Sequence, residues 1–173
     1  MKFAPIHTFE TALSHEIYAS YCQSFPEDER RELAQFQKLF NHKMVELLSI
    51  VQENKNIGYL ILWKLSHFVF IEHFEVFETF RGQSFGSQIL KELSDIYPKI
   101  VLETEHGNLN EIAKRRVSFY QRNGFSIIDN NYIQPKYSEE KKSLPLLLLA
   151  NFTTPNPQKI ATEIHNNVYG INP

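Results

Sequence analysis

Cysteine is almost absent from this sequence of 173 residues, which contains Cys22 and no other. A single cysteine excludes a disulfide within the chain and any metal site built from several cysteines, and it favours a reducing compartment. The seven histidines show no pair spaced to bind a metal from one face of a helix. We therefore predict no metal site.

The sequence also lacks an excess of positive charge, because 18 Lys and Arg residues stand against 20 Asp and Glu residues. Neither nucleic acid nor an anionic membrane is expected as a partner. The longest apolar run, Leu144–Ala150, contains Pro145 and is far shorter than the roughly 18 residues of a membrane span. The first ten residues, MKFAPIHTFE, lack the apolar stretch of a secretory signal. We expect a cytoplasmic protein.

What the chain does contain is a succession of strand and helix patterns, at a length that suits one domain over residues 1–173. Apolar patterns predict strands over residues 2–6, 44–51, 57–65, 68–77, 100–104, 125–128 and 144–152. Helices are predicted over residues 10–23, 26–40, 110–122 and 157–169, and between a glycine-containing turn at residues 81–86 and Pro98. Residues 130–142 are polar and indicate a loop. This order predicts an α/β fold with a mixed, mostly antiparallel central sheet of six to seven strands flanked by helices.

The most informative segment is residues 68–90, FVFIEHFEVFETFRGQSFGSQIL, in which a hydrophobic strand, a short turn and an amphipathic helix follow one another. The first turn of a helix has N–H groups without intrahelical partners and lies at the positive end of the macrodipole, so it binds phosphate. Gly82 and Gly86 allow the backbone to approach a ligand closely. The turn matches neither the nucleoside-triphosphate loop nor the dinucleotide fingerprint. We therefore predict another phosphate-bearing cofactor.

Two motifs resemble those of the GNAT superfamily of N-acetyltransferases, whose cofactor is acetyl-CoA. The superfamily's Arg/Gln-x-x-Gly-x-Gly/Ala signature follows its fourth strand, where this chain has Arg81-Gly-Gln-Ser-Phe-Gly86. A second signature, Tyr-x-x-x-Gly-Phe at the end of a helix, is matched by Tyr120-Gln-Arg-Asn-Gly-Phe125. The segment 132–137 and the apolar strand after it are similar to uncharacterised bacterial members.

The resemblance implies an enzyme that transfers an acetyl group from acetyl-CoA directly to a primary amine. Tyr120 matches the residue that protonates the departing CoA thiolate, and it would also contact the cofactor. The strand before the turn would bind the pantetheine arm through the backbone of Phe74, Glu75 and Val76. The pyrophosphate would lie on the amides of Arg81, Gly82, Gln83, Ser84, Phe85, Gly86 and Ser87. Because the transfer is direct, we interpret Cys22 as a small buried hydrophobic residue and not as a nucleophile.

The general base is left open among several carboxylates. Glu72 is the first candidate, Glu75 the second and Glu103 the third, while Glu105 and His73 are further ones and a water relay is an equal alternative. In a regular strand Glu72 and Glu75 point to opposite faces, so only one would face the cleft, and His73 would share the face of Glu75. Superfamily members often have a bulge in this strand, and a bulge would change which of the two glutamates faces the cleft.

Two departures from the superfamily pattern motivate a rival hypothesis. Ser84 replaces the first glycine of the cofactor signature, and Ala113 stands where many members carry an asparagine that contacts the pantetheine. The rival is a non-catalytic acyl-CoA-binding sensor or regulatory module. A weaker one is an interaction domain that binds no CoA.

The acceptor and the assembly are less closely defined. Carboxylates at 72, 75, 103 and 105 would favour a cationic amine, such as an aminoglycoside, a polyamine or a lysine side chain, if they face the cleft; peptide N-termini and other small amines stay open. Phe25, Phe36 and Phe40 could line an acceptor pocket. We interpret the basic run 114–116 as a solvated face and not as a contact with the CoA 3′-phosphate. Both a monomer and a homodimer are compatible with the sequence.

Overall fold

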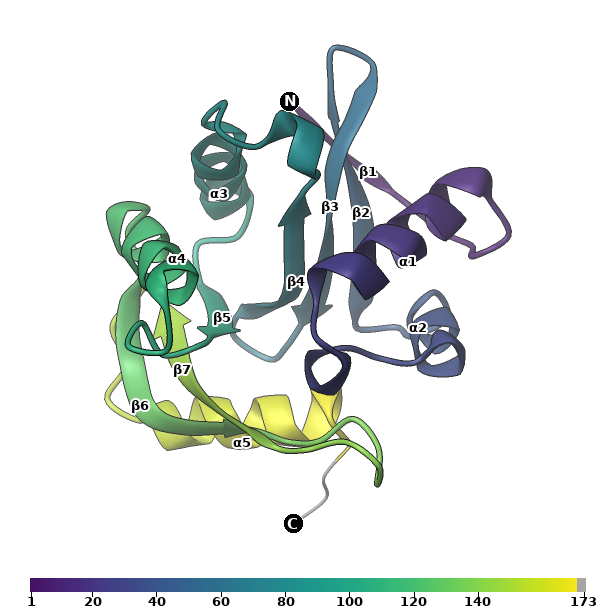
Figure 1. Ribbon diagram of the computed structural model, residues 1–173. Coiled ribbons are helices and arrows are strands. Elements are labelled where there is room, and N and C mark those ends of the chain that lie inside the picture. The colour runs from purple at the N-terminus through teal and green to yellow at the C-terminus, as the bar shows by residue number, and fades with distance from the viewer. Residues whose placement is uncertain (171–173) are drawn as a thin grey trace.

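A seven-stranded mixed sheet forms the centre of the molecule (Figure 1). The computed structural model describes residues 1–170, so residues 171–173 of the predicted domain lie outside the described part. The strands follow the order β1-β2-β3-β4-β5-β7-β6, and only β4 and β5 pair in parallel. They are β1 (Lys2–Pro5), β2 (Val45–Gln52), β3 (Lys55–Lys64), β4 (Val69–Val76), β5 (Ile100–Thr104), β6 (Ser126–Gln134) and β7 (Leu144–Ala150). The predicted mixed, mostly antiparallel sheet is confirmed.

Helices cover both faces of this sheet (Figure 1). The helices α1 (Ala12–Ser24), α2 (Leu33–Leu39) and α5 (Pro157–Val168) contribute to one hydrophobic cluster, and α3 (Phe85–Ile96) and α4 (Glu111–Arg122) contribute to the other. Among residues 1–170, no helix is both long and apolar enough to cross a membrane.

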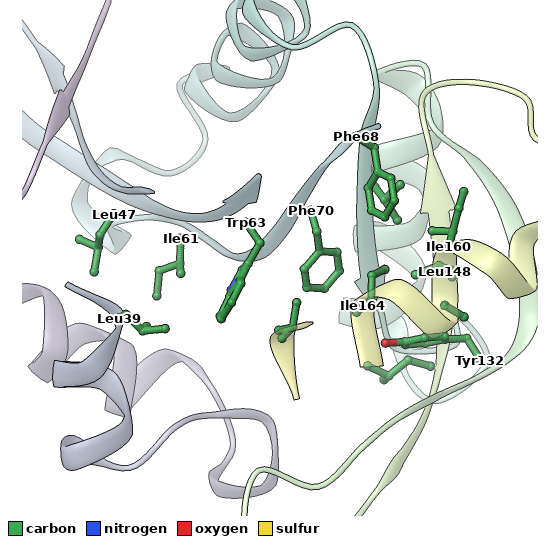
Figure 2. Packing of buried hydrophobic residues seen from close by; sticks show 14 of the residues in the cluster. Leu39, Leu47, Ile61, Trp63, Phe68, Phe70, Tyr132, Leu148, Ile160 and Ile164 are labelled. Carbon is green, nitrogen blue, oxygen red and sulfur yellow. The ribbon is translucent and has the colours of Figure 1, made fainter. Parts of the chain in front are cut away.

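The cluster under α1, α2 and α5 is continuous across the sheet (Figure 2). Leu39 of α2 lies near Leu47 and Ile61 at one end, while Ile160 and Ile164 of α5 lie near Leu148 at the other. Between them, Trp63 and Phe70 are almost completely buried. Burial of apolar area on this scale is the main favourable term in folding, and it fixes α1 and α5 on the same face of β4 and β5.

Two predicted elements differ from the structure. The predicted helix 26–40 is a short 3₁₀ helix, Glu27–Glu29, followed by extended backbone at Arg30 and by α2, which begins only at Leu33. The extended link brings the Arg31 backbone N–H to the Tyr21 hydroxyl at 2.6 Å, a tertiary contact that overrides the helical pattern.

The predicted loop 130–142 is wrong in its first part, because β6 continues to Gln134. Tyr132 and Gln134 are buried, whereas the residues that alternate with them are exposed, so the strand keeps one face on the core despite its polar composition. Irregular register between Ile127 and Tyr132 explains why the pattern is not a regular alternation.

Candidate active site

The central cleft begins where β4 and β5 part. These strands pair only from Val69↔Ile100 to Ile71↔Leu102, and beyond that point they diverge. The opening is part of a cleft of about 1080 Å³ whose walls come from α1, β4, the turn before α3, β5, α4 and β6. Ligands of open α/β sheets bind where neighbouring strands separate, so this fork is the place expected to hold one.

On one side of the fork, the turn before α3 presents a row of backbone amides. Gly82 has φ +77°, and Ser84, at the N-cap of α3, has φ +62°. The helix begins at Phe85, and the Gln88 amide is bonded to the Ser84 carbonyl at 3.3 Å. The amides of the preceding helical residues therefore remain available to an anion at the positive end of the helix dipole. A Cβ on Gly82 would meet no atom within 4 Å, so this part of the turn is open.

Along β4 the backbone N–H and C=O groups point alternately toward the neighbouring strand β3 and toward the cleft. The Phe77 amide donates to the Ile57 carbonyl at 2.9 Å, and the Glu75 carbonyl lies only 2.1 Å from where a Cβ on Gly58 would stand. Residues 75 and 77 thus face β3, and the backbone groups of Phe74 and Val76 face the fork. Of the three residues expected to bind a pantetheine through their backbone, Glu75 has its backbone directed away from the cleft.

A bulge in β4 corrects the expected directions of the carboxylates. Ile61 pairs with His73 but Leu62 pairs with Ile71, so one residue of β4 is extra. As a result Glu72 and His73 both contact residues on the α1 and α5 side, and so does Glu75. The expectation that only one of the two glutamates would face the cleft is wrong, since both line it together with His73.

Glu72 is buried in a network that uses both of its oxygens. Arg31 Nε donates to Oε1 at 2.8 Å, Tyr137 donates to the same oxygen at 2.8 Å, and Trp63 Nε1 donates to Oε2 at 2.7 Å. Burial opposes the charged form, but Arg31 and these donors outweigh it and hold the pKa of Glu72 below its ordinary value. A carboxylate stabilised in this way is a poor proton acceptor.

Glu75 and His73 occupy the neighbouring part of the cleft. Ser20 and Ser24 of α1 donate to Glu75 Oε1 at 3.0 and 2.5 Å, and Arg81 Nη2 lies 3.3 Å from the same oxygen. Arg81 also donates from Nε to the Val76 carbonyl at 2.8 Å, so its side chain joins the cofactor turn to the end of β4. Burial lowers the pKa of His73 to about 4, which leaves the imidazole neutral at pH 7.

Tyr120 lines the cleft from the last turn of α4. The Phe125 amide bonds the Tyr120 carbonyl at 3.1 Å and the Gly124 amide bonds the Gln121 carbonyl at 3.1 Å, while Gly124 has φ +86°. This is a Schellman motif, and it explains the spacing of the Tyr-x-x-x-Gly-Phe signature. Burial raises the pKa of Tyr120 to about 12, so its hydroxyl keeps its proton at neutral pH.

A model of the acetyltransferase (GNAT) family matches residues 12–125, a range that contains the fork, the amide turn and Tyr120. The chain belongs to this family. It is thus a GNAT-family N-acetyltransferase, as the two sequence motifs implied. None of the curated proteins compared with this acetyltransferase matches it.

Solved structures show the same GNAT fold. A candidate GNAT-family acetyltransferase from Bacteroides thetaiotaomicron is similar over 99% of this chain and 100% of its own, at 29% identity and a TM-score of 0.92. A GNAT acetyltransferase from Elizabethkingia anophelis with acetyl-CoA bound has 22% identity and a TM-score of 0.57, and covers 86% of this chain and 95% of its own. An aminoglycoside 6′-N-acetyltransferase in complex with coenzyme A has 13% identity and a TM-score of 0.63, over 90% and 99%.

The basic run 114–116 and the three phenylalanines proposed for an acceptor pocket agree only in part with the expectations from the sequence. Arg115 and Arg116 line the cleft, whereas Lys114 does not. Phe25 also lines it, but Phe36 is completely buried and Phe40 packs against the same core cluster. Within residues 1–170, no three His, Cys, Asp or Glu side chains are grouped so as to hold a metal ion.

Several residues that shape the cleft carried no sequence signal. Arg31 reaches Glu72 across 41 positions, and its Nη2 donates to the Val168 carbonyl across 137 positions at 2.8 Å. The hydroxyl of Tyr169, just after α5, donates a hydrogen bond to Glu103. Such contacts depend on the tertiary fold and leave no local pattern in the chain.

Proposed function

We propose that this protein is an acetyl-CoA-dependent N-acetyltransferase that acts on a cationic primary amine by direct transfer. The observation that carries the proposal is the arrangement of the β4–β5 fork, with backbone amides on one side and carboxylates on the other. An anionic donor and a cationic acceptor would approach the fork from opposite sides, which keeps their charges near complementary groups.

The residues of the amide turn fit the pyrophosphate of coenzyme A. Ser84 occupies the left-handed region that a glycine holds in the family signature, so its backbone follows the same course and its amide stays in the row. Arg81, whose guanidinium is exposed, and Arg115 and Arg122 also line the cleft and add positive charge to it. Bound acetyl-CoA supplies a thioester whose carbonyl carbon the amine attacks and whose sulfur departs as a thiolate.

Two groups of the chain act on that chemistry. The Phe74 amide faces the fork and serves as a donor toward a carbonyl oxygen that gains negative charge. Tyr120 holds a proton at its hydroxyl and gives it to the departing sulfur; the nitrogen then loses a proton as the amide forms, which restores the tyrosine. Burial raises the pKa of Tyr120 to about 12, so the hydroxyl is protonated at neutral pH and has a proton to donate.

The acceptor side of the cleft is acidic. Glu29 from the 3₁₀ helix, Glu72 and Glu75 from β4, and Glu103 from β5 all line it. Electrostatic complementarity favours an acceptor that arrives as a cation. One protein of the same fold is an aminoglycoside 6′-N-acetyltransferase, and an aminoglycoside is among the acceptors to be tested.

Binding and turnover together test the proposal. Isothermal titration with acetyl-CoA, desulfo-CoA and adenosine 3′,5′-bisphosphate measures the cofactor site, and thiol release with kanamycin, spermidine, tryptamine and an alanyl peptide measures transfer. We expect acetyl-CoA binding and turnover of at least one amine. Binding without turnover of any amine would instead support the non-catalytic sensor, and absence of binding would reject both.

The acid role of Tyr120 is tested by Tyr120→Phe. We expect kcat to fall by about 100-fold, because general acid catalysis contributes on that scale, while acetyl-CoA binding is retained. Tyr97→Phe is the control, since Tyr97 bonds Glu46 away from the cleft. Equal activity of the Tyr120 and Tyr97 variants would remove Tyr120 from the mechanism.

A further inference from the structure

The cleft is lined by several residues with a buried polar atom that makes no hydrogen bond with residues 1–170, and these are His73, Glu75, Glu103, Thr104 and Gln134. In His73 and the two glutamates, another atom of the side chain is hydrogen-bonded. Thr104 and Gln134 are different, because their side chains make no hydrogen bond at all with the described part of the chain. They are therefore the two buried polar side chains of the cleft that are left without a partner.

Gln134 lies on the acceptor side of the sheet, and Thr104 lies on the cofactor side. Tyr132, two residues before Gln134 on β6, belongs to the cluster under α1, α2 and α5, and strand alternation places Gln134 on the same face. Leu102, two residues before Thr104 on β5, belongs to the cluster under α3 and α4. Of the two side chains, only the carboxamide of Gln134 therefore lies where an acceptor would meet it.

Gln134 also lies outward from the β4–β5 fork. Thr104 pairs with Leu147 of β7, whereas Gln134 pairs with Leu144, so Gln134 lies farther along β7 than β5 reaches. Leu146 stands between these two positions on β7, and its side chain lines the cleft. An acceptor whose amine enters the fork would thus pass over an apolar side chain before it reaches the carboxamide.

A buried carboxamide without partners opposes folding. Gln134 is only 2% exposed, so burial removes its hydrogen bonds to solvent, and no residue from 1 to 170 replaces them. Native proteins provide hydrogen bonds for nearly all buried polar groups, and an exception calls for an explanation. Because this exception faces a binding cleft, the missing partner is expected to come from a ligand.

We propose that the Gln134 carboxamide binds a hydroxyl or carboxamide group of the acceptor, separated from the reacting amine by an apolar spacer. The Gln134 side chain donates through its N–H groups and accepts through its C=O, and a hydroxyl or a second carboxamide is a neutral group that satisfies both. A carboxylate only accepts, and a second ammonium only donates. This inference rests on the proposed function, since it requires an amine acceptor, and it selects among cationic amines those that carry such a group.

Pairs of amines that differ only in the terminal group test the contact. The pairs are ethanolamine and propylamine, 3-aminopropanol and butylamine, 4-aminobutanol and pentylamine, and 5-aminopentanol and hexylamine, in which a hydroxyl replaces a methyl group at the same chain length. β-Alaninamide and isopentylamine form the corresponding pair for a carboxamide. In at least one pair we expect kcat/KM of the wild type to be about tenfold higher for the polar member, because the alkyl member leaves Gln134 unpaired.

Gln134→Met keeps the length of the side chain and removes the carboxamide. We expect this variant to bind acetyl-CoA like the wild type and to lose the preference for the polar member, a change of about tenfold or more in the ratio of kcat/KM values. The midpoint of urea unfolding should rise by about 0.5 M, because an unpaired buried amide is removed. An unchanged preference or a lower midpoint would overturn the proposal.

Gln134→Asn keeps the carboxamide and withdraws it by one methylene group. The hydrogen bond to a hydroxyl that was well placed for glutamine is then stretched, so we expect the preference to weaken or to move to a longer amino alcohol. If the asparagine variant kept the wild-type preference at every chain length, direct contact with Gln134 would be rejected.

Gln35→Met is the matched control. Gln35 does not line the cleft, and its amide is fully engaged, since Nε2 donates to the Tyr137 carbonyl at 2.6 Å and Oε1 accepts from the Glu32 amide at 3.0 Å. This variant should lower the midpoint of urea unfolding and leave the preference within each pair unchanged. A loss of preference as large as in Gln134→Met would overturn the proposal, because the effect would not depend on the cleft.

The wild type separates failure of this inference from failure of the proposed function. If it binds acetyl-CoA but transfers to no member of the pairs and to no amine of the panel above, the proposed function fails and this inference fails with it. If it transfers to an amine of that panel but to no member of the pairs, or at equal kcat/KM within every pair, only this inference fails.

Discussion

Arg31 and Glu72, 41 positions apart in the chain, form a buried ion pair with Nε and Oε1 at 2.8 Å at the junction of four segments. The Arg31 guanidinium also bonds the carbonyl at the end of α5 and lies 4.9 Å from the centre of the Tyr137 ring. The link before α2, the strand β4, the β6–β7 loop and α5 therefore meet at one side chain. The acceptor side of the cleft depends on their staying together.

Removal of Arg31 should destabilise the protein strongly. Arg31→Met leaves Glu72 buried without its cation, and breaking a buried pair from one side costs about 3–5 kcal/mol. Urea unfolding at pH 7 measures the free energy of unfolding. Lys64→Met is the control, because the Lys64–Glu46 pair is largely exposed and should contribute less than about 1 kcal/mol. If the two variants lost similar amounts of unfolding free energy, the buried Arg31–Glu72 pair would contribute no more to stability than the exposed Lys64–Glu46 pair.

Local patterns predicted the parts of the site that local physics builds. The glycine turn before α3 and the end of α4 at Tyr120–Phe125 depend on helix termini and on positive φ angles. Glycine is the residue that favours such angles, so the sequence indicates where they occur. The bulge at Glu72 and His73 is suggested only by the resemblance to the superfamily and not by a local pattern, since an extra residue in β4 is defined by its register against β3. Tyr169, whose partner Glu103 lies 66 positions earlier, is indicated by neither.

Ser84 should be replaceable by glycine with a gain in stability. A non-glycine residue in the left-handed region is strained by about 1–2 kcal/mol, and glycine relieves this strain while losing some of the gain to its greater freedom in the unfolded chain. We expect Ser84→Gly to raise the free energy of unfolding by about 0.5–1 kcal/mol without weakening acetyl-CoA binding in a titration.

The same substitution elsewhere in α3 gives the control. Ser94 lies inside the helix and donates to the Leu90 carbonyl at 2.8 Å. Ser94→Gly should therefore destabilise the protein by about 0.5–1 kcal/mol. If both variants shifted the free energy of unfolding in the same direction, strain at Ser84 would not be the cause.

Gly58 should tolerate no side chain. Its Cβ would lie 2.1 Å from the Glu75 carbonyl oxygen, a backbone atom that cannot move without separating β3 from β4. Gly58→Ala is expected to cost about 3 kcal/mol or more in urea unfolding and to weaken acetyl-CoA binding, because Phe74 and Val76 move with that strand. For Gly107→Ala the nearest atom is 3.4 Å away, so this variant should lose less than about 1 kcal/mol. A stable Gly58→Ala would mean that the two strands pair less closely than described.

The pH dependence of the free energy of unfolding tests whether the pKa of Glu103 is raised in the folded protein, without an activity assay. Its pKa is about 8 in the fold and 4.5 in the absence of the fold, so between these values the folded state keeps a proton that the unfolded chain has released. Stability must then fall as the pH rises from 4.5 to 8. Glu103→Gln removes this term, and we expect the variant to be more stable than the wild type at pH 9, on the order of a few kcal/mol, and equally stable at pH 4.

Glu46→Gln should show the opposite sign. Burial opposes the charge of Glu46, but Lys64 and Tyr97 outweigh it and hold the pKa of Glu46 below its ordinary value. The charge therefore stabilises the fold above the unfolded pKa, and that contribution is lost as the pH falls. The Glu46 variant is therefore expected to be slightly less stable than the wild type at pH 9, by less than about 1 kcal/mol. If Glu103→Gln were instead less stable than the wild type at pH 9, the Glu103 carboxylate and Tyr169 would form a contact that stabilises the fold.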